Sequence, residues 1–519
     1  GQQRITALRA AILGEKIITK DYKEERIYIA FHPVTEVFET LTPAIQKDKA
    51  WIQDISKLMN KEGGLFDDVN AYCDKNPDVD RHLIEKNIEK LLQVKNKQVG
   101  FIELEHSLDI ETVTEIFIRI NSKGVVLSQA DFAMSKIASY DTEDNFGVNL
   151  RKCIDYFCHL SREPQFYKHI SENDEEFKNT AYLSRIAWLK DEKDDLYDPD
   201  YSDVLRVSFT KQFERGKIAD LVALLSGRNF ETRSFEQAIM DESFQKLRDA
   251  VLDFVNETNF KRFVMIIKSC GFTSNDLINS QNALNFAYIL YLKLREKGVN
   301  PSVIEKCVQK WFVMSLLTGR YSGSPESQFD FDIKQVSKDG AEKILDSIEA
   351  ADLSDAFWDA RLVQELDKAT INSPYLNLFF AAQIKAGDKG FLSTDITVGN
   401  LISHRGDIHH LFPKEYLKTK FKNRGDYNQI ANFVYAQSEI NIKIGKKAPK
   451  EYMEEVHKQS GGGKLKYGGI TDKETLAENL KQNSIPENFD KMEIDDYPDF
   501  LKKRRKLMAK KIKEYYKNL

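Results

Sequence analysis

The stretch Asp407-Ile408-His409-His410-Leu411-Phe412-Pro413 places two neighbouring histidines at the end of a predicted strand. Successive side chains of a regular strand alternate between its two faces, so Asp407 and His409 share one face while His410 lies on the other. If both imidazoles serve one site, the strand must therefore end or turn within this stretch. Pro413 is consistent with such an end, because proline cannot donate a ladder hydrogen bond.

Two asparagines follow the histidine pair among basic residues, with Asn432 22 residues after His410 and Asn441 nine residues further on. These residue types together suit metal-assisted hydrolysis of a phosphodiester. An imidazole with its usual pKa of about 6.5 can take a proton from water, and a divalent cation offsets charge on the phosphate. His409 and Asn441 would supply metal ligands, and Asn432 would hold the base in one tautomer. The alternative is that the histidines bond backbone carbonyls and the asparagines form turns.

The same stretch, followed by Asn432-Phe433-Val434 and residues 441–449, resembles the HNH, or ββα-metal, nuclease motif. It is similar to the variant found at the C-terminus of GmrSD-like modification-dependent restriction endonucleases. The resemblance implies a divalent cofactor, Mg²⁺ or Mn²⁺, and a histidine that activates water. It assigns His410, the general base, and Asn432 to catalysis, and Asp407, His409 and Asn441 to the metal.

Positive charge gathers in the C-terminal part of the chain. Residues 401–519 carry 25 Lys and Arg against 17 Asp and Glu, a net charge of +8, although the whole chain carries −5. Residues 501–519 hold nine basic residues and one glutamate, so we expect them to contact a polyanion; the alternative is a solvated helix face. We further expect Lys443, Lys446 and Lys447 to bind the phosphate backbone of DNA.

The chain begins with Gly1-Gln2-Gln3-Arg4 directly before a helical pattern, a position where backbone N–H groups favour an anion. This tetrapeptide, with Ile5-Thr6-Ala7-Leu8 after it, resembles the second half of the DGQQR signature of a GmrS-type, ParB/sulfiredoxin-like domain. The sequence lacks an initiator methionine and the aspartate of that signature. We therefore expect that an upstream part of this domain is not included.

Two further stretches, residues 117–131 and 317–324, are similar to the same two-part proteins. The resemblance implies that the N-terminal domain binds or hydrolyses a nucleoside triphosphate and senses modified DNA. It assigns nucleotide contacts to Gly1, Gln2, Gln3, Arg4, Arg119 and Asn121. For Arg119 and Asn121, the residues alone equally favour a salt-bridged helix end with an asparagine cap beside Gly124.

Periodicity and turn signals divide the 519 residues into three domains, in keeping with roughly 100–200 residues per domain. We expect a truncated ParB/sulfiredoxin-like α/β domain at 1–140, a helical domain at 141–388 and a ββα-metal HNH domain with helices at 389–519. The fold class is therefore α+β and mostly helical.

Local sequence patterns predict individual helices, a strand, a helix cap and a loop. Apolar spacing predicts a helix at 5–12, a strand at 27–31 that Pro33 stops, and a helix at 81–95. Ser128 and Asp131 form a predicted capping box at the start of the next helix. The glycine-rich residues 460–469 are predicted to be a flexible insertion.

Composition argues against a membrane protein or a disulfide-stabilised one. No apolar run reaches the roughly 18 residues of a membrane span, and the five cysteines form no CxxC pair. We expect a cytoplasmic protein with reduced thiols and no membrane partner.

The expected function is that of a modification-dependent DNA endonuclease, a type IV-like restriction enzyme that acts on modified phage DNA in defence. Nucleotide binding or hydrolysis in the N-terminal domain would regulate it, and a homodimer would help it cut both strands. Two alternatives stay open. One is a non-cleaving, nucleotide-switched reader of modified DNA, and the other is an HNH effector nuclease that ignores modification.

Overall fold

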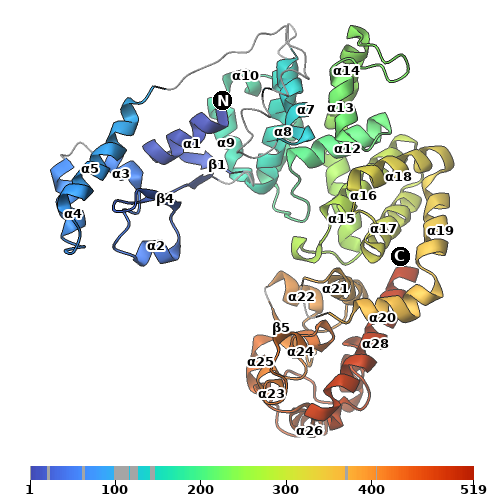
Figure 1. Cartoon of the computed structure of the whole chain (residues 1–519). Helices are drawn as coiled ribbons and strands as arrows, with labels where there is room; N and C mark the ends of the chain where they lie inside the picture. Colours follow the sequence, from blue (N-terminus) through green and yellow to red (C-terminus); the bar gives the residue numbers. More distant parts are fainter. Residues whose placement is uncertain are drawn as a thin grey trace. The chain divides into compact units, whose positions relative to one another are not determined.

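The computed structural model describes residues 2–19, 24–60, 65–98, 116, 127–140, 146–368, 372–404 and 406–519, without the side chains of residues 2–4 and 407. Helices hold 66% of the described residues, and the described strands form three separate two-stranded antiparallel sheets (Figure 1). The expected α+β, mostly helical class is therefore confirmed. No helix within the described ranges is both long and apolar enough to cross a membrane.

Two compact units make up the chain, one of Gly1–Val126 with Cys158–Phe166 and one of Leu127–Phe157 with Tyr167–Leu519. Helix α8 (Phe146–Arg162) contributes residues to both. Most of the expected helical domain and all of the expected nuclease domain lie in the second unit. The domain boundaries at residues 140 and 388 and the ParB-like fold stay predictions.

The first unit combines two short hairpins with helices around a small core of Phe31, Ile55, Met59 and Leu91. The predicted helices at 5–12 and 81–95 are confirmed, and the predicted strand near 27–31 is present and ends before Pro33. Its described elements are α1 (Gln2–Leu13), β1 (Lys16–Ile18), β2 (Glu24–Arg26), β3 (Ile29–His32), β4 (Val37–Thr40), α2 (Pro43–Lys47), α3 (Ile55–Asn60), α4 (Leu65–Cys73), α5 (Arg81–Leu92), η1 (Gln93–Asn96) and η2 (Pro164–Phe166).

The second unit begins with a body of packed helices. Long amphipathic and apolar segments bury aromatic rings here, and Tyr197, Phe254, Phe260 and Tyr288 pack edge to face or stacked against one another. The described helices of this body are α7 (Gln129–Ser139), α9 (Tyr167–Asn173), α10 (Glu175–Lys178), α11 (Ala181–Ile186), η3 (Ala187–Asp191), α12 (Tyr201–Phe213), α13 (Ile218–Leu225), α14 (Gln237–Phe254), α15 (Glu257–Ser269), η4 (Asn275–Leu277), α16 (Gln281–Glu296), α17 (Pro301–Thr318), α18 (Pro325–Asp339), α19 (Ala341–Asp352), η5 (Phe357–Arg361), α20 (Leu362–Glu365) and α21 (Pro374–Ala386).

The predicted capping box at the start of α7 is confirmed. The Ser128 hydroxyl accepts the backbone N–H of Asp131 at 3.2 Å, and the Asp131 carboxylate accepts the backbone N–H of Ser128 at 2.8 Å. Tyr201 donates to the other carboxylate oxygen of Asp131 at 2.7 Å. The motif residues 128–131 thus start one helix and fasten it to the beginning of α12.

Residues 317–324 comprise the end of α17 and the turn that leads from it to α18. Gly319 ends α17 with φ of +64°, a left-handed conformation that favours glycine. Arg320 then forms a two-pronged ion pair with Asp332, which is 0% exposed and also accepts the Tyr321 hydroxyl at 2.8 Å. The recurring residues of this stretch therefore have a structural role, because they close the turn and neutralise a buried carboxylate.

Replacement of Asp332 by alanine should lower the free energy of unfolding by about 3–5 kcal/mol, because it leaves the Arg320 charge without its partner. Urea denaturation followed by circular dichroism measures the loss. Lys334→Ala on the same helix, which removes an exposed ion pair with Asp330, is the matched control. An Asp332→Ala loss no larger than that of the control would contradict the assigned role.

The prediction of a flexible insertion at residues 460–469 is wrong. Gln459, 1% exposed, donates to the carbonyls of Tyr467 and Ile470 at 2.8 Å each and accepts the N–H groups of Lys466 and Tyr467. One buried amide thus fixes both ends of the loop. The glycines allow the backbone to turn tightly, for example at Gly468, which adopts a left-handed conformation with a φ of +54°.

Candidate active site in a ββα hairpin

The C-terminal residues of the second unit build a hairpin and the helices around it. The hairpin is followed at once by a short helix, so the order is strand, strand, helix. The described elements are α22 (Val398–Ser403), β5 (Asp407–His410), α23 (Lys414–Leu417), α24 (Arg424–Tyr427), η6 (Ile430–Asn432), β6 (Phe433–Ala436), α25 (Ser438–Ile444), α26 (Pro449–Ser460), α27 (Lys473–Gln482), η7 (Phe489–Lys491), η8 (Ile494–Asp496) and α28 (Tyr497–Lys517).

The two strands are antiparallel, with Asp407 opposite Ala436 and His410 opposite Phe433. The ladder continues one step past β5, because the Leu411 N–H donates to the Asn432 carbonyl at 2.8 Å. The chain then turns at Pro413, which precedes α23. The strand therefore ends only after both histidines, and because the ladder pairs His409 with Val434 and His410 with Phe433, their side chains start from opposite faces of the hairpin.

His410 lies half-buried at the end of β5. Its Nε2 atom is 3.1 Å from the amide oxygen of Asn428, and its ring meets Phe433 edge to face at 4.9 Å between centroids. Burial lowers the pKa of His410 below its usual value; the hydrogen bond with Asn428 opposes this shift, and the positive charge of Lys414 adds to it. The imidazole is therefore neutral at cellular pH, as a general base must be.

The side chain of Asn432 hydrogen-bonds Phe412 and not His410, so the prediction that Asn432 holds the base in one tautomer is wrong. Its amide oxygen accepts the Phe412 N–H at 2.8 Å and its amide nitrogen donates to the Phe412 carbonyl at 3.0 Å. The side chain is 0% exposed, so it is out of reach of substrate. Asn432 therefore fixes the backbone after the histidine pair, whereas the contact with the base comes from Asn428, which sequence reasoning missed.

The expected metal ligands lie on two elements of the same motif. His409 is buried in β5 at 4% exposure, and Asn441 is half-buried in α25. The backbone of Asp407 begins β5, but its side chain lies outside the described residues. Within the described part of the chain, no three His, Cys, Asp or Glu side chains gather as a metal site. Imidazole and amide oxygen are donors that Mn²⁺ accepts, whereas Mg²⁺ prefers oxygen ligands and water.

The expected DNA-binding lysines differ in their surroundings. Lys443 and Lys446 are exposed on and just after α25. Lys447 instead pairs with Glu455 at 2.8 Å and donates to the Tyr467 hydroxyl at 2.6 Å. Lys447 and Lys466 together lower the pKa of Glu455 to about 2, so this carboxylate stays ionised and remains paired with Lys447. Lys447 is therefore part of the domain's own packing.

Arg504 of α28 holds the hairpin from behind. Its guanidinium is 0% exposed and donates to the carbonyls of Ala431 at 2.6 Å, Phe433 at 2.8 Å and Asn483 at 3.2 Å. Burial lowers the pKa of Arg504 to about 9, so it remains charged at neutral pH. Sequence reasoning missed it, although Arg504 lies four residues from both Phe500 and Met508, in the apolar stripe of its helix.

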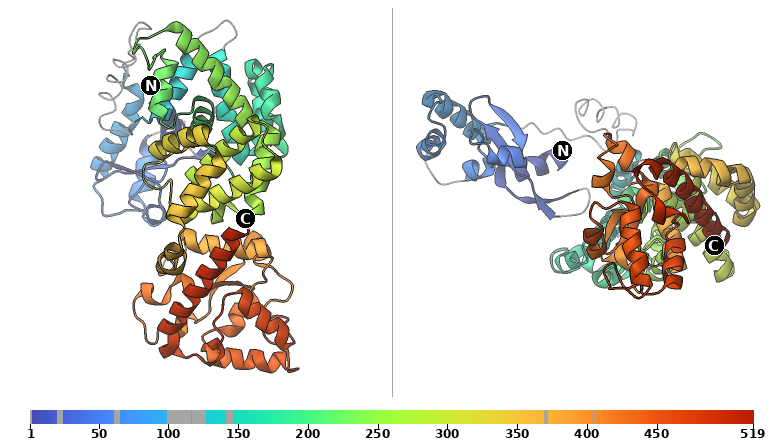
Figure 2. Two further views of the ribbon diagram at one scale, coloured as in Figure 1. Left: turned by 90° about the vertical axis from the view of Figure 1, so that its right-hand side faces the viewer. Right: turned by 90° about the horizontal axis from the view of Figure 1, so that it is seen from below.

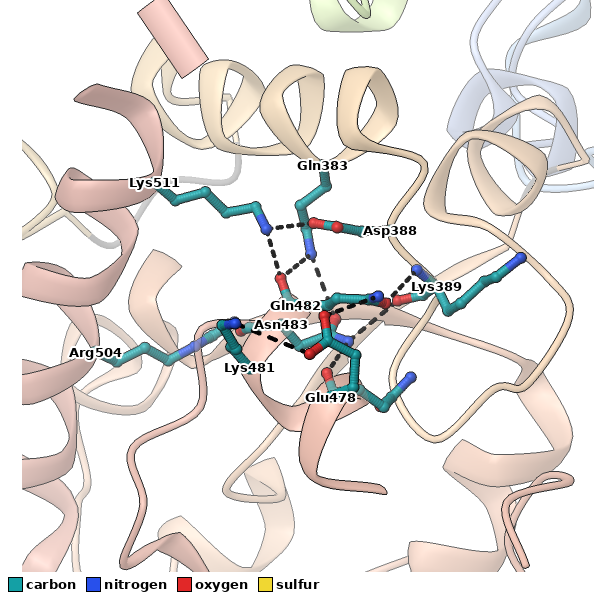
Figure 3. A network of polar contacts seen from close by, with 10 residues as sticks. Gln383, Asp388, Lys389, Glu478, Lys481, Gln482, Asn483, Arg504 and Lys511 are labelled. Carbon is teal, nitrogen blue, oxygen red and sulfur yellow. Dashed lines mark hydrogen bonds and ion pairs between the residues drawn. The ribbon is translucent and has the colours of Figure 1, made fainter. Parts of the chain in front are cut away.

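Other polar side chains join α28 to its neighbours, as Figure 3 shows. Lys511 pairs with Asp388 and donates to the Gln482 carbonyl at 3.0 Å, and Gln383 donates to that same carbonyl at 3.1 Å. Asn483 donates to the Lys389 carbonyl at 3.1 Å. The helix is the dark red element in Figure 2, and it packs against α21 and η6.

Part of the basic closing stretch packs within the chain, whereas its other basic residues, Lys502, Lys503, Lys506, Lys510 and Lys517, are exposed, so the expected polyanion contact stays a prediction. Arg504 is buried, and Lys511 pairs with Asp388, Lys513 with Asp355 and Asp359, and Arg505 with Asp367. Lys511, Lys513 and Arg505 thus form ion pairs with carboxylates from distant parts of the chain. The stretch 501–519 therefore packs through one face of its helix and keeps five exposed lysines outside that face.

The expected nucleotide site lies outside what the structure describes. Gly1, Arg119 and Asn121 are outside the described residues, and the side chains of Gln2, Gln3 and Arg4 are not described. Their roles stay predictions.

Comparison with known proteins bears on the N-terminal part of the chain. Residues 1–138 match the family model described as the GmrSD restriction endonuclease, N-terminal domain. The chain therefore carries a GmrSD-like N-terminal domain, as the resemblance of its first residues implied.

One similar protein is the uncharacterized protein MJ0686 of Methanocaldococcus jannaschii. It is 27% identical over 227 residues, which cover 40% of this chain and 37% of that protein. The chain thus spans well under half of this relative's length. No solved structure matches the chain.

Arg504→Met should lower the free energy of unfolding by at least about 3 kcal/mol. Three buried carbonyls would lose their donor, and each unsatisfied group costs about 1–3 kcal/mol. Urea denaturation measures the loss, with Lys506→Met, an exposed position of the same helix, as control. If the two variants unfold alike, the guanidinium does not support the hairpin.

Proposed function

We propose that this chain is a metal-dependent DNA endonuclease of the modification-dependent, type IV-like restriction class, acting in defence on modified phage DNA. The observation that carries the proposal is a GmrSD-like N-terminal domain joined to a strand, strand, helix motif with His410 at the strand end. In this proposal the N-terminal domain binds or hydrolyses a nucleotide through Gly1, Gln2, Gln3, Arg4, Arg119 and Asn121.

The geometry of the hairpin supports water activation by His410. The ring of His410 is neutral, contacts Asn428 and Phe433, and belongs to the last residue of β5. His410 takes a proton from water, and the hydroxide attacks phosphorus while the bond to the leaving oxygen breaks. A bound divalent cation would stabilise the charge that develops on the phosphate.

The metal in this proposal is Mg²⁺ or Mn²⁺, held by His409, Asn441 and Asp407. The described donors, an imidazole and an amide, fit Mn²⁺ better than Mg²⁺. His409 is held in place by the strand ladder and is 4% exposed. We therefore expect stronger cleavage with Mn²⁺ than with Mg²⁺.

The outward face of α25 is the proposed contact with DNA. Glu439, Ile442 and Lys443 are exposed on α25, and Lys446 is exposed just after the helix ends at Ile444. Ile442 is 79% exposed, so the face offers an apolar side chain next to Lys443. The lysines would bind the phosphate backbone beside the scissile bond without reading sequence.

His410→Ala should abolish cleavage of modified phage DNA, a loss of about 10²–10⁴-fold, and leave DNA binding largely unchanged. The assay compares modified and matched unmodified DNA with Mg²⁺ or Mn²⁺, with and without nucleotide. His404→Ala is the matched control, because His404 is an exposed histidine six residues before His410. Cleavage retained by His410→Ala would refute the assignment of the base.

The same assay separates the alternatives. Binding that depends on modification and nucleotide, without a metal-dependent product, would indicate a non-cleaving reader of modified DNA. Equal cutting of modified and unmodified DNA would indicate an effector nuclease that ignores modification.

Lys443→Gln and Lys446→Gln should each weaken DNA binding and reduce the slope of log affinity against log salt by about one. The reason is that the protein then neutralises one phosphate fewer, so binding releases fewer counterions from the DNA. Fluorescence anisotropy with duplex DNA at several salt concentrations measures the slope. Lys458→Gln on α26, where the lysine pairs with Glu454, is the control. An unchanged slope in both test variants would exclude this face as the DNA contact.

A further inference from the structure

The half-buried Asn428 is the only described side chain shown to hydrogen-bond the ring of His410. It follows α24 as the helix cap, 18 residues along the chain from the histidine, and its backbone N–H donates to the Arg424 carbonyl at 3.1 Å. No part of the HNH resemblance includes this residue.

We propose that Asn428 is the positioning residue of the base: its amide oxygen accepts Nε2–H of His410 and so leaves Nδ1 as the nitrogen that takes the proton from water. This inference rests on the proposed function and adds to it the residue that decides which ring nitrogen reacts.

The chemistry of the pair supports this assignment. A neutral imidazole carries one proton, and a carbonyl oxygen only accepts hydrogen bonds. When the Asn428 oxygen faces Nε2, the proton must therefore be on Nε2 and the lone pair on Nδ1. The Phe433 ring stands at 88° to the imidazole, so the ring is confined on one face as well as at its tip.

Asn428 is itself held firmly, as a positioning residue must be. Tyr427 before it is buried, and its carbonyl accepts the Tyr497 hydroxyl at 3.3 Å. Gln429 after it accepts Arg505 at 3.1 Å and donates to the Gly425 carbonyl at 2.7 Å. Side chains of α28 therefore hold the segment on both sides of Asn428 and, through it, the ring of the base.

The test compares the full-length protein with Asn428→Leu, which keeps the branched shape and removes the acceptor, and Asn428→Asp, which keeps an acceptor oxygen. The matched control is Asn423→Leu, an exposed position at the other end of α24. We expect Asn428→Leu to lose about 10–100-fold in kcat with little change in KM, the size of effect seen when an orienting partner is removed. Asn428→Asp should recover most of the rate, and melting temperatures should stay alike.

A second readout does not depend on cleavage. NMR of protein labelled with ¹⁵N-histidine, with the His410 signal assigned through His410→Ala, reports which nitrogen carries the proton. We expect the Nε2–H form in the unaltered protein and in Asn428→Asp, and a mixture of tautomers in Asn428→Leu.

The outcomes separate this inference from the proposed function. An Nδ1–H form in the unaltered protein, or an unchanged tautomer and kcat in Asn428→Leu, would overturn the role of Asn428 while leaving His410 as the base. If the unaltered protein cuts no DNA, the proposed function fails, and the tautomer comparison alone still decides whether Asn428 fixes the ring.

Discussion

The C-terminal site depends on one buried guanidinium. Arg504 reaches from the last helix to the carbonyls of Ala431 and Phe433, which flank Asn432, and to the carbonyl of Asn483 at the end of α27. A charge in such a position needs several acceptors to offset its lost hydration, and three backbone carbonyls provide them. The strand β6, the turn before it and the closing helix are therefore placed by the same side chain.

The turn after the histidine pair is fixed from the other side by packing and hydrogen bonds. Phe412 is 0% exposed and packs against Phe500 at 4.9 Å and Tyr497 at 5.1 Å between ring centroids. Asn432 pairs with both backbone groups of Phe412, and Tyr452 donates to the Leu411 carbonyl at 2.8 Å. The backbone after His410 has little freedom, which is what a base needs if it is to meet water in one orientation.

The helical body and the C-terminal domain are joined by polar contacts as well as by apolar packing. Lys511 of α28 pairs with Asp388, just beyond α21, and Tyr515 donates to the Cys270 carbonyl at 2.6 Å. The same helix that supports the hairpin therefore also binds the helical body. A change in the body has a physical route to the base through α28 and the segment that carries Asn428.

The sequence by itself determined the elements whose signals are local: the helices, the strand that ends after the histidine pair and before Pro413, the capping box at Ser128 and Asp131, and the histidine pair. Such features depend on residue spacing and on backbone chemistry within a few positions. Only the tertiary structure decided the roles that need partners far along the chain. It shows that the contact with the base comes from Asn428 and not from Asn432, that Lys447 pairs with Glu455, and that Arg505, Lys511 and Lys513 of the basic tail pair with distant carboxylates. Hydrogen bonds and ion pairs between distant residues leave no period in the sequence, because the fold alone brings their partners together.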